Sequence, residues 1–557
     1  MSKDRQPNPQ GQTPLTAYVQ EPYPHVTFTY QPFGNRPGAS AEPERAETYY
    51  NRAGALKEQN RVPEALAAFD QAIALKPDFA QAHNGRGIAL ANLNRSHEAI
   101  AAFDRAVALM PDYAEAHNNR GIVLHELKRL EDALSSFDRA IALQPNNARA
   151  HSNRGAALYD AKRLDDALAS YDEAIALKGD YAEAYYNLGI VLQDLRRLDE
   201  ALAALDRAIA LKPDYAAAHN NRGVVLMNLR RLDEALAAFE TTIALTGGFA
   251  EVHVNQSHCL LLMGRLEQGW RLHEWRKKTE TPVGNRSFRQ PLWLGREDVA
   301  NKTLFIHWEQ GLGDTIQFYR YGKLLKARGA KVVISVQEPL CRLLNQMDSD
   351  IRVLNGDEVP AAFDYHCPLM SLPLALGTNL KNIPSDSPYI FSDEQLRPAW
   401  DARLPPRTKP RIGLVWRGST LHKNDHNRSI DIAALGPLFT ADAHWISLQK
   451  DLGGGDSALL REFRIARLGE DLKDFSDTAA VVDLLDVVIT VDTSVAHLAG
   501  AMGKPVWIFL PYNSDWRWLT GRDSSPWYPT ARLFRQNDAG AWENPVGRVH
   551  AALREYV

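Results

Sequence analysis

The hydrophobic positions of residues 45–280 repeat with a period of 34. Within one period Ala99 and Phe103 lie four residues apart, so both face the same side of one helix. The small side chain lets two helices close on each other, and the aromatic ring fills the space beside them. The period predicts helical hairpins, and it is kept by Ala65, Ala99, Ala133, Ala167, Ala201 and Ala235; by Phe69, Phe103, Phe137, Tyr171, Leu205 and Phe239; by Gly87, Gly121, Gly155, Gly189 and Gly223; and by Pro77, Pro111, Pro145 and Pro213, with Gly179 and Gly247 in two proline slots.

This pattern resembles the tetratricopeptide repeat, with six clear copies and a degenerate seventh that ends near residue 278. One such hairpin has no core of its own, so it is stable only within a stack. The sequence therefore predicts an all-α solenoid over residues 45–280 that holds a partner.

Two polar columns follow the same period. Asparagine occupies one position of the first helix, and histidine occupies another in most copies, as at His83 and His117. Neighbouring histidines would lie about 10 Å apart, too far to share a metal ion. The asparagines suit the backbone of an extended peptide acceptor, although they also suit a simple polar helix face. This candidate acceptor groove consists of Asn119, Asn153, Asn187, Asn221 and Asn255.

From about residue 301 the pattern changes to strands alternating with helices, which is typical of parallel sheets covered on both faces. A linker rich in Pro and Asp, about residues 382–410, separates two such units. We expect two Rossmann-like domains, 281–405 and 406–557, behind a disordered arm at 1–44 in which only 25–30 resembles a strand. The expected strands are 303–308, 331–336, 411–416, 444–448, 487–491 and 505–510.

Composition and charge argue against a nucleic-acid-binding protein, a membrane-spanning protein and a disulfide-rich protein. The net charge of −4 gives no electrostatic reason to expect a nucleic acid. No apolar run approaches the ~20 residues that span a bilayer. The three cysteines show neither a disulfide framework nor a metal spacing, which favours free thiols in the cytoplasm.

Candidate chemistry starts in a glycine loop that follows the first expected strand. Gly311 and Gly313 let the backbone approach a ligand at the carboxyl end of a strand. Asp314 follows them and Glu309 precedes them, so either carboxylate is a candidate general base. Asp314 also suits a plain helix cap.

Three further segments suggest an anion site. The loop 417–428 carries Arg417, Lys423 and Arg428, which suit a diphosphate. A strand runs into a helix at 492–497, where backbone amides and two hydroxyls suit an anion. The tryptophan cluster at 516–518 and 527 favours a buried core. Asp348 and Asp350 form an Asp-x-Asp pattern that we interpret as a solvated turn.

Together these segments resemble bacterial glycosyltransferases of the two-Rossmann GT-B fold that carry tetratricopeptide repeats. The matching segments are GRLEQGWRLHEWR, QPLWLG, EQGLGDTIQFYRY, FDYHCPLMSLPLALGT, KNDHNRSI, VDTSVAHLAGAMGKPVW and SDWRW. The motifs also resemble those of heptosyltransferases, and the domain order resembles that of protein O-GlcNAc transferases. The resemblance implies a base role for Asp314, and donor binding by Lys423, Asp492, Thr493, Ser494 and His497. The chemistry of the two loops adds further donor-binding candidates, Gly311, Gly313, Arg417 and Arg428.

The implied reaction transfers a sugar from a nucleotide-diphosphate donor to a hydroxyl, on a protein held by the repeats. It requires no metal and no cofactor besides the donor. The main alternative is a repeat scaffold whose transferase domain is inactive. A nicotinamide dehydrogenase lacks support because no Gly-x-Gly-x-x-Gly follows an expected strand. The sequence leaves the sugar and the nucleotide open.

Overall fold

The computed structural model describes residues 45–279, 286–419 and 424–557. These residues divide into two compact units, 45–226 and 227–557. The expected arm at 1–44, with its candidate strand, lies outside the described residues. Among the described helices, none is both long and apolar enough to cross a bilayer.

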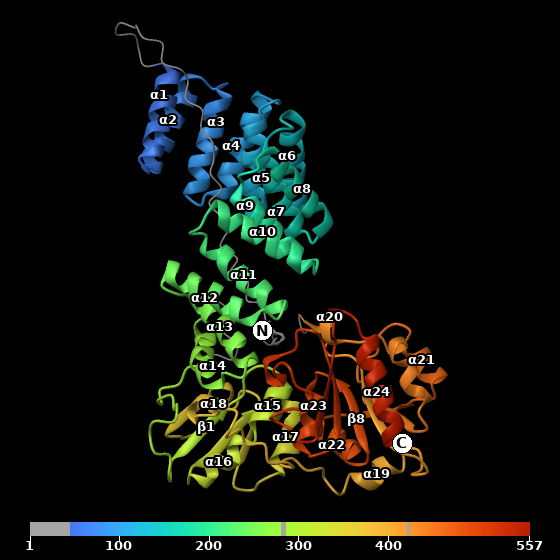
Figure 1. The fold of residues 1–557 in the computed structure, drawn as a ribbon. Coiled ribbons are helices and arrows are strands. Elements are labelled where there is room, and N and C mark those ends of the chain that lie inside the picture. Colours follow the sequence, from blue (N-terminus) through green and yellow to red (C-terminus); the bar gives the residue numbers. More distant parts are fainter. Residues whose placement is uncertain (1–44, 280–285, 420–423) are drawn as a thin grey trace, which may run out of the picture. The chain divides into compact units, whose positions relative to one another are not determined.

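Helical hairpins make up the first unit and continue into the second (Figure 1). Each odd-numbered helix packs against the next even-numbered one, as the 34-residue period predicted. Helix α11 spans the division between the units. The helices are α1 Ala46–Glu58, α2 Val62–Leu75, α3 Ala80–Asn92, α4 Ser96–Leu109, α5 Ala114–Glu126, α6 Leu130–Leu143, α7 Ala148–Asp160, α8 Leu164–Leu177, α9 Ala182–Asp194, α10 Leu198–Leu211, α11 Ala216–Asn228, α12 Leu232–Thr246, α13 Ala250–Leu262 and α14 Leu266–His273.

The repeated glycine and aromatic positions contact each other inside each hairpin. A Cβ atom at Gly121 would lie only 2.6 Å from Cε1 of Phe137, and Gly87 faces Phe103 at the same distance. The aromatic ring therefore occupies the space that any side chain on the first helix would need. This contact explains why both positions keep the period.

The histidine column is structural. Nε2 of His83 lies 3.1 Å from the carbonyl oxygen of Pro77, and His117, His151 and His219 bond in the same way to the proline six residues before them. Where Gly179 replaces that proline, Tyr185 replaces the histidine. These four histidines thus bind their turns to their own helices, whereas His253 stacks on Trp275.

The asparagine column is not the open row of amides that the sequence suggested. Asn119 and Asn221 are 1% exposed and Asn255 is fully buried, while Asn153 and Asn187 are half-buried. The amide of Asn119 donates to Asn84 in the preceding hairpin, Asn153 donates likewise to Asn118, and Asn221 donates to the Tyr186 hydroxyl. The expectation of exposed amides is wrong because successive hairpins pack closely enough to use these groups themselves.

The second unit contains the end of the helical array and two parallel sheets. After α14 comes a 3-10 helix, η1 Glu274–Lys278. The first sheet has the order β3-β2-β1-β4 and the second has the order β10-β9-β8-β5-β6-β7. The strands are β1 Thr303–His307, β2 Lys331–Val336, β3 Arg352–Asn355, β4 Tyr365–Pro368, β5 Arg411–Val415, β6 His444–Ser447, β7 Ala466–Arg467, β8 Val487–Val491, β9 Val506–Leu510 and β10 Ala531–Arg535.

All named strand pairs in both sheets are parallel, which agrees with the predicted α/β class. Each of the six expected strands matches a strand of the structure to within one residue at either end. The strands β3, β4, β7 and β10 were not predicted. The first three have at most four residues each, and the apolar run of β10 is interrupted by Arg532. The helices that connect the strands of the two sheets, or follow them, include α15 Leu312–Phe318, α16 Tyr321–Ala327, α17 Glu338–Asn345, α22 Phe475–Asp483, α23 Ser494–Ala501 and α24 Glu543–Tyr556.

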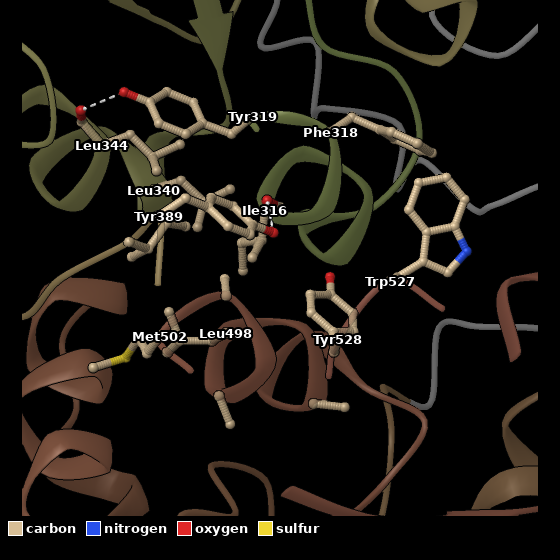
Figure 2. Close-up of a cluster of buried hydrophobic side chains, with 14 of the residues drawn as sticks. Ile316, Phe318, Tyr319, Leu340, Leu344, Tyr389, Leu498, Met502, Trp527 and Tyr528 are labelled. Atoms are coloured by element: carbon tan, nitrogen blue, oxygen red, sulfur yellow. Dashed lines mark hydrogen bonds between the residues drawn. The ribbon is translucent and has the colours of Figure 1, made fainter. Parts of the chain in front are cut away.

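One hydrophobic core joins the two sheets and the last hairpin. Figure 2 shows part of it: Ile316 of α15 lies on the side of that helix toward Leu498 of α23, and Phe318 of α15 packs edge-on against Trp527 at 5.9 Å. Packing of α15 against α23 sets the relative position of the two helix starts. It places the two predicted binding segments side by side.

Candidate functional site

The glycine loop and the Asp-Thr-Ser segment meet at the start of two helices. The loop connects β1 to α15, and the second segment connects β8 to α23. A Cβ atom at Gly313 would lie 2.7 Å from Cδ2 of His497, so only a glycine fits there without a shift. The fold therefore brings together, at the carboxyl ends of two strands, two residues that are 184 positions apart in the sequence.

Asp314 is buried, and both of its carboxylate oxygens are engaged. Oδ2 accepts a 2.8 Å hydrogen bond from the Gly311 amide, and Oδ1 forms an ion pair with Arg517. Arg517 also donates to Asp515 across 2.7 Å. Burial would lower the pKa of Arg517, but Asp314 and Asp515 outweigh it and raise that pKa. Asp314 is thus not the N-cap that one reading of the sequence had, because Gly311 holds that position; Asp314 is the third residue of α15, accepts from the Gly311 amide, and is also part of a buried ion-pair chain.

Glu309, the other candidate base, is also buried. Its oxygens accept from Nε and Nη2 of Arg276 at 3.3 and 2.8 Å, and from the Met370 amide at 3.1 Å. Arg276 lies in η1, directly after the helical array. Glu309 therefore connects the last hairpin to the first sheet.

Asp492 differs from Asp314 and Glu309 in its electrostatic setting. Burial raises its pKa to about 6, and repulsion by Asp515 acts in the same direction. Arg428 donates to the Asp492 carbonyl oxygen at 3.0 Å and lowers the same pKa in part. Thr493 caps α23, and Ser494 begins that helix.

His497 is buried behind these residues. Its Nδ1 lies 2.9 Å from the Tyr528 hydroxyl, and its ring stacks on Trp518 at 5.3 Å. Burial lowers the pKa of His497 to about 3, with Arg517 acting in the same direction, so the ring is neutral at neutral pH. Its neutral ring packs against the glycine loop.

The cationic loop is described only at its two ends. Arg417 is half-buried and lies 3.5 Å from Asp456. Arg428 pairs with Asp425 at 3.1 Å. Lys423 lies outside the described residues.

Two other expectations, the turn at 348–350 and the buried tryptophan cluster, agree with the structure. Asp348 and Asp350 both pair with Lys326 in a turn, with Asp350 67% exposed. Among the residues that are described, no cluster of His, Cys, Asp and Glu suits a metal ion. Trp516, Trp518 and Trp527 belong to the core, and the three cysteines are free thiols.

Arginines are the main site residues that sequence reasoning missed. Arg517 and Arg276 lie in segments, SDWRW and HEWR, that carry a family resemblance but no motif of their own. Arg320 is also buried and bonds to Tyr389 and to the carbonyl oxygens of Pro384 and Trp527, each at 2.8 Å. The partners of these three arginines are known only from the folded structure, because no residue spacing in the sequence predicts these contacts.

Models of the tetratricopeptide repeat match residues 50–114, 88–148 and 186–248, and a second repeat model matches 157–196. The helical array is a tetratricopeptide-repeat solenoid. Repeat arrays of this kind present extended surfaces to proteins or peptides. The matches cover the array and not the two parallel sheets.

A curated relative, protein FlbA of Caulobacter vibrioides, is 28% identical over 316 residues. The match covers 52% of this chain and 52% of FlbA, so the chain spans about half the length of that relative.

Similar solved structures belong to repeat proteins. YrrB, described as a TPR protein with an unusual peptide-binding site, is 29% identical, covering 31% of this chain and 89% of its own (TM-score 0.28). PilW, a type IV pilus biogenesis factor, is 19% identical, covering 37% and 96% (TM-score 0.36). The pilF protein of Pseudomonas aeruginosa is 18% identical, covering 36% and 90% (TM-score 0.33).

Proposed function

We propose that residues 286–557 transfer a sugar from a nucleotide-diphosphate donor to a hydroxyl of a polypeptide that the repeats present. The observation that carries the proposal is the contact between the glycine loop after β1 and the Asp-Thr-Ser segment after β8. Parallel α/β sheets bind ligands at the carboxyl ends of their strands. Two such ends, one from each sheet, contribute to this one place.

The proposed reaction forms a bond from the acceptor oxygen to the anomeric carbon and breaks the bond to the diphosphate. Negative charge then develops on the leaving phosphate oxygens. Arg428 and the start of α23, an eight-residue helix, supply positive charge at the end of β8. The acceptor hydroxyl gives its proton to a carboxylate, and we propose Asp314 for this role. Its ion pair with Arg517 favours the charged form that a base needs.

A protein acceptor suits the repeat array, which in this class of fold binds polypeptides. The buried asparagines do not offer a ready peptide grip, so other side chains of the array must provide it. The proposal therefore separates two activities, donor cleavage in the α/β part and acceptor capture in the array.

The test is a donor-hydrolysis screen with UDP-, GDP- and ADP-sugars on the full chain and on Asp314→Asn. We expect one donor to be cleaved, and the variant to bind the nucleoside diphosphate normally while turnover falls roughly a hundredfold, as loss of a general base does. Asp350→Asn changes a largely exposed carboxylate and serves as the control. Near-normal turnover in Asp314→Asn would leave that residue with a structural role only.

A second function, a scaffold without catalysis, is favoured by one observation. Both candidate bases, Asp314 and Glu309, are fully engaged by arginines and backbone amides. This reading predicts neither hydrolysis of any donor nor binding of a nucleoside diphosphate in the same screen.

A further inference from the structure

Three arginines gather at the carboxyl edge of the six-stranded sheet. Arg535 is the last residue of β10, and Arg522 lies in the loop that precedes this strand. Arg230 comes from the helical array, in the turn between α11 and α12. These three residues are called the arginine cluster below.

Their contacts are almost entirely with uncharged groups. Arg535, only 7% exposed, donates to the Ser514 hydroxyl at 2.6 Å and to the carbonyl oxygens of Trp518 and Arg522 at 2.5 and 3.2 Å. The guanidinium carbon of Arg230 lies 4.1 Å from the centre of the Tyr512 ring. Arg522 donates to Ser524.

The cluster has more positive charge than its surroundings balance. No carboxylate in the described part of the chain forms an ion pair with any of the three, while Asp523 and Asp492 act on Arg535 only from farther away. Burial lowers the pKa of Arg535 to about 10, with Arg230 the leading repulsive charge and Arg522 adding to it. A buried cation without a partner is unfavourable, and an anion removes that penalty.

Several donors of the cluster are buried without a hydrogen-bond acceptor. Nη2 of Arg230 and Nε of Arg522 have none, nor does the amide nitrogen of Gln536, a side chain only 2% exposed. Gln536 directly follows Arg535, and its amide oxygen accepts from the Tyr512 amide at 2.9 Å. The unpaired donors thus lie on residues that contact one another around the loop after β9.

We propose that the arginine cluster binds the phosphates of the nucleotide donor, and that Arg230 is contributed to this site by the repeat array. The cluster lies along the same strand edge as the segment after β8, since β10, β9 and β8 are neighbours. Guanidinium groups match phosphate oxygens in charge and geometry. The inference rests on the proposed function and gives it a specific donor contact.

The chain contains its own control for Arg230. Residues 195–204 and 229–238 have the identical sequence LRRLDEALAA, so Arg196 and Arg230 occupy equivalent positions. Both have a positive φ, 63° and 59°, so the same substitution meets the same backbone conformation at both positions. Arg196 is exposed, whereas Arg230 is half-buried against Tyr512.

The experiment measures binding of inorganic pyrophosphate and of UDP, GDP and ADP to the full chain by calorimetry. Arg230→Ala is expected to weaken binding by about tenfold or more, the effect of losing a charge-assisted hydrogen bond. Arg196→Ala is expected to leave it unchanged. Arg522→Gln provides a second variant, with thermal unfolding of all forms as the check on folding.

The outcomes separate this inference from the proposed function. Pyrophosphate binding that depends on Arg230 without cleavage of any donor would keep the anion site and remove the transferase. Donor cleavage with equal nucleotide affinity in Arg230→Ala, Arg522→Gln and the unaltered chain would keep the transferase and overturn the arginine site. Absence of binding by every phosphate tested would overturn it too.

Discussion

At the scale of single residues, arginines hold the carboxylates that the sequence offers as bases. Arg517 pairs with Asp314 and Asp515, and Arg276 pairs with Glu309. A buried ion pair fixes geometry, and removal of one partner leaves a charge whose burial costs about 3–5 kcal/mol. These pairs keep the candidate site in one arrangement, whichever chemistry it performs.

Asp492 makes the stability of the fold depend on pH. Its pKa is about 6 in the folded protein against 3.8 ordinarily, so the folded form binds the proton more tightly. Ionisation of Asp492 therefore lowers the free energy of unfolding. This loss is absent below about pH 4, grows up to about pH 6 and then stays constant. We expect Asp492→Asn to gain about 1–3 kcal/mol over the unaltered chain at pH 8, and about a third of that at pH 4.5.

Urea unfolding at the two pH values measures this gain. Asp180→Asn, in an exposed turn, is the control. An equal change of stability at both pH values would show that burial does not disfavour the Asp492 charge.

At the scale of elements, the helical hairpin depends on one contact between a glycine and a large side chain. The same contact recurs between Gly155 and Tyr171, where a Cβ atom would lie 2.9 Å from the ring. Each hairpin then turns at a residue with positive φ, which is Asn, Lys or Arg in six copies and Gly264 in the last. A chain with these two features folds into hairpins whatever its surface carries.

This contact gives a matched pair of glycine variants. Gly121→Ala is expected to destabilise the array by about 1–3 kcal/mol, because the methyl group must displace the Phe137 ring. Gly179→Ala is expected to stabilise it by about 0.4–1 kcal/mol, because nothing lies within 4 Å of its Cβ position and its φ is not positive.

Chemical unfolding followed by helix circular dichroism measures both variants. A stabilising effect of Gly121→Ala, which helix propensity alone would give, would show that the Phe137 contact does not select glycine at position 121.

At the scale of the whole molecule, the last hairpin belongs to the core of the α/β part. Trp270 of α14 packs edge-on against Trp516 at 5.0 Å and Phe318 at 6.4 Å. Ser257 of α13 bonds to the carbonyl oxygen of Gly269 at 3.0 Å, which fixes the hairpin itself. In the seventh repeat, which is degenerate in sequence, residues that depart from the repeat pattern therefore contact the α/β part.

A pair of truncations tests how far this core extends. A chain of residues 227–557 retains Trp270 and the Arg276–Glu309 pair, and we expect it to unfold in one cooperative thermal transition. A chain of residues 281–557 lacks both and leaves Glu309 buried without its partner, so we expect it to be unstable or aggregated.

Scanning calorimetry and size-exclusion chromatography compare the two forms. Equal stability would support the domain boundary at residue 280 that the sequence suggested, and would make the α14 contacts dispensable.

The sequence by itself determined the elements whose signal is local. The 34-residue period fixed the hairpins because the same glycine, alanine and aromatic contacts recur within each copy. Hydrophobic runs bounded by turn residues fixed six strands of the parallel sheets, because strands buried on both faces read as continuous apolar segments. The glycine loop and the segment after β8 were found for the same reason, since each joins a strand to a helix start.

Only the tertiary structure decided which distant residues meet. Nothing local links Asp314 to Arg517, or Glu309 to Arg276, because their pairing depends on how α15, α23 and η1 pack. The same holds for Asn119, which is bonded to the preceding hairpin, and for Arg230, which differs from Arg196 only in what surrounds it. Identical local sequences fold alike, but burial and charge come from neighbours that the local sequence does not specify.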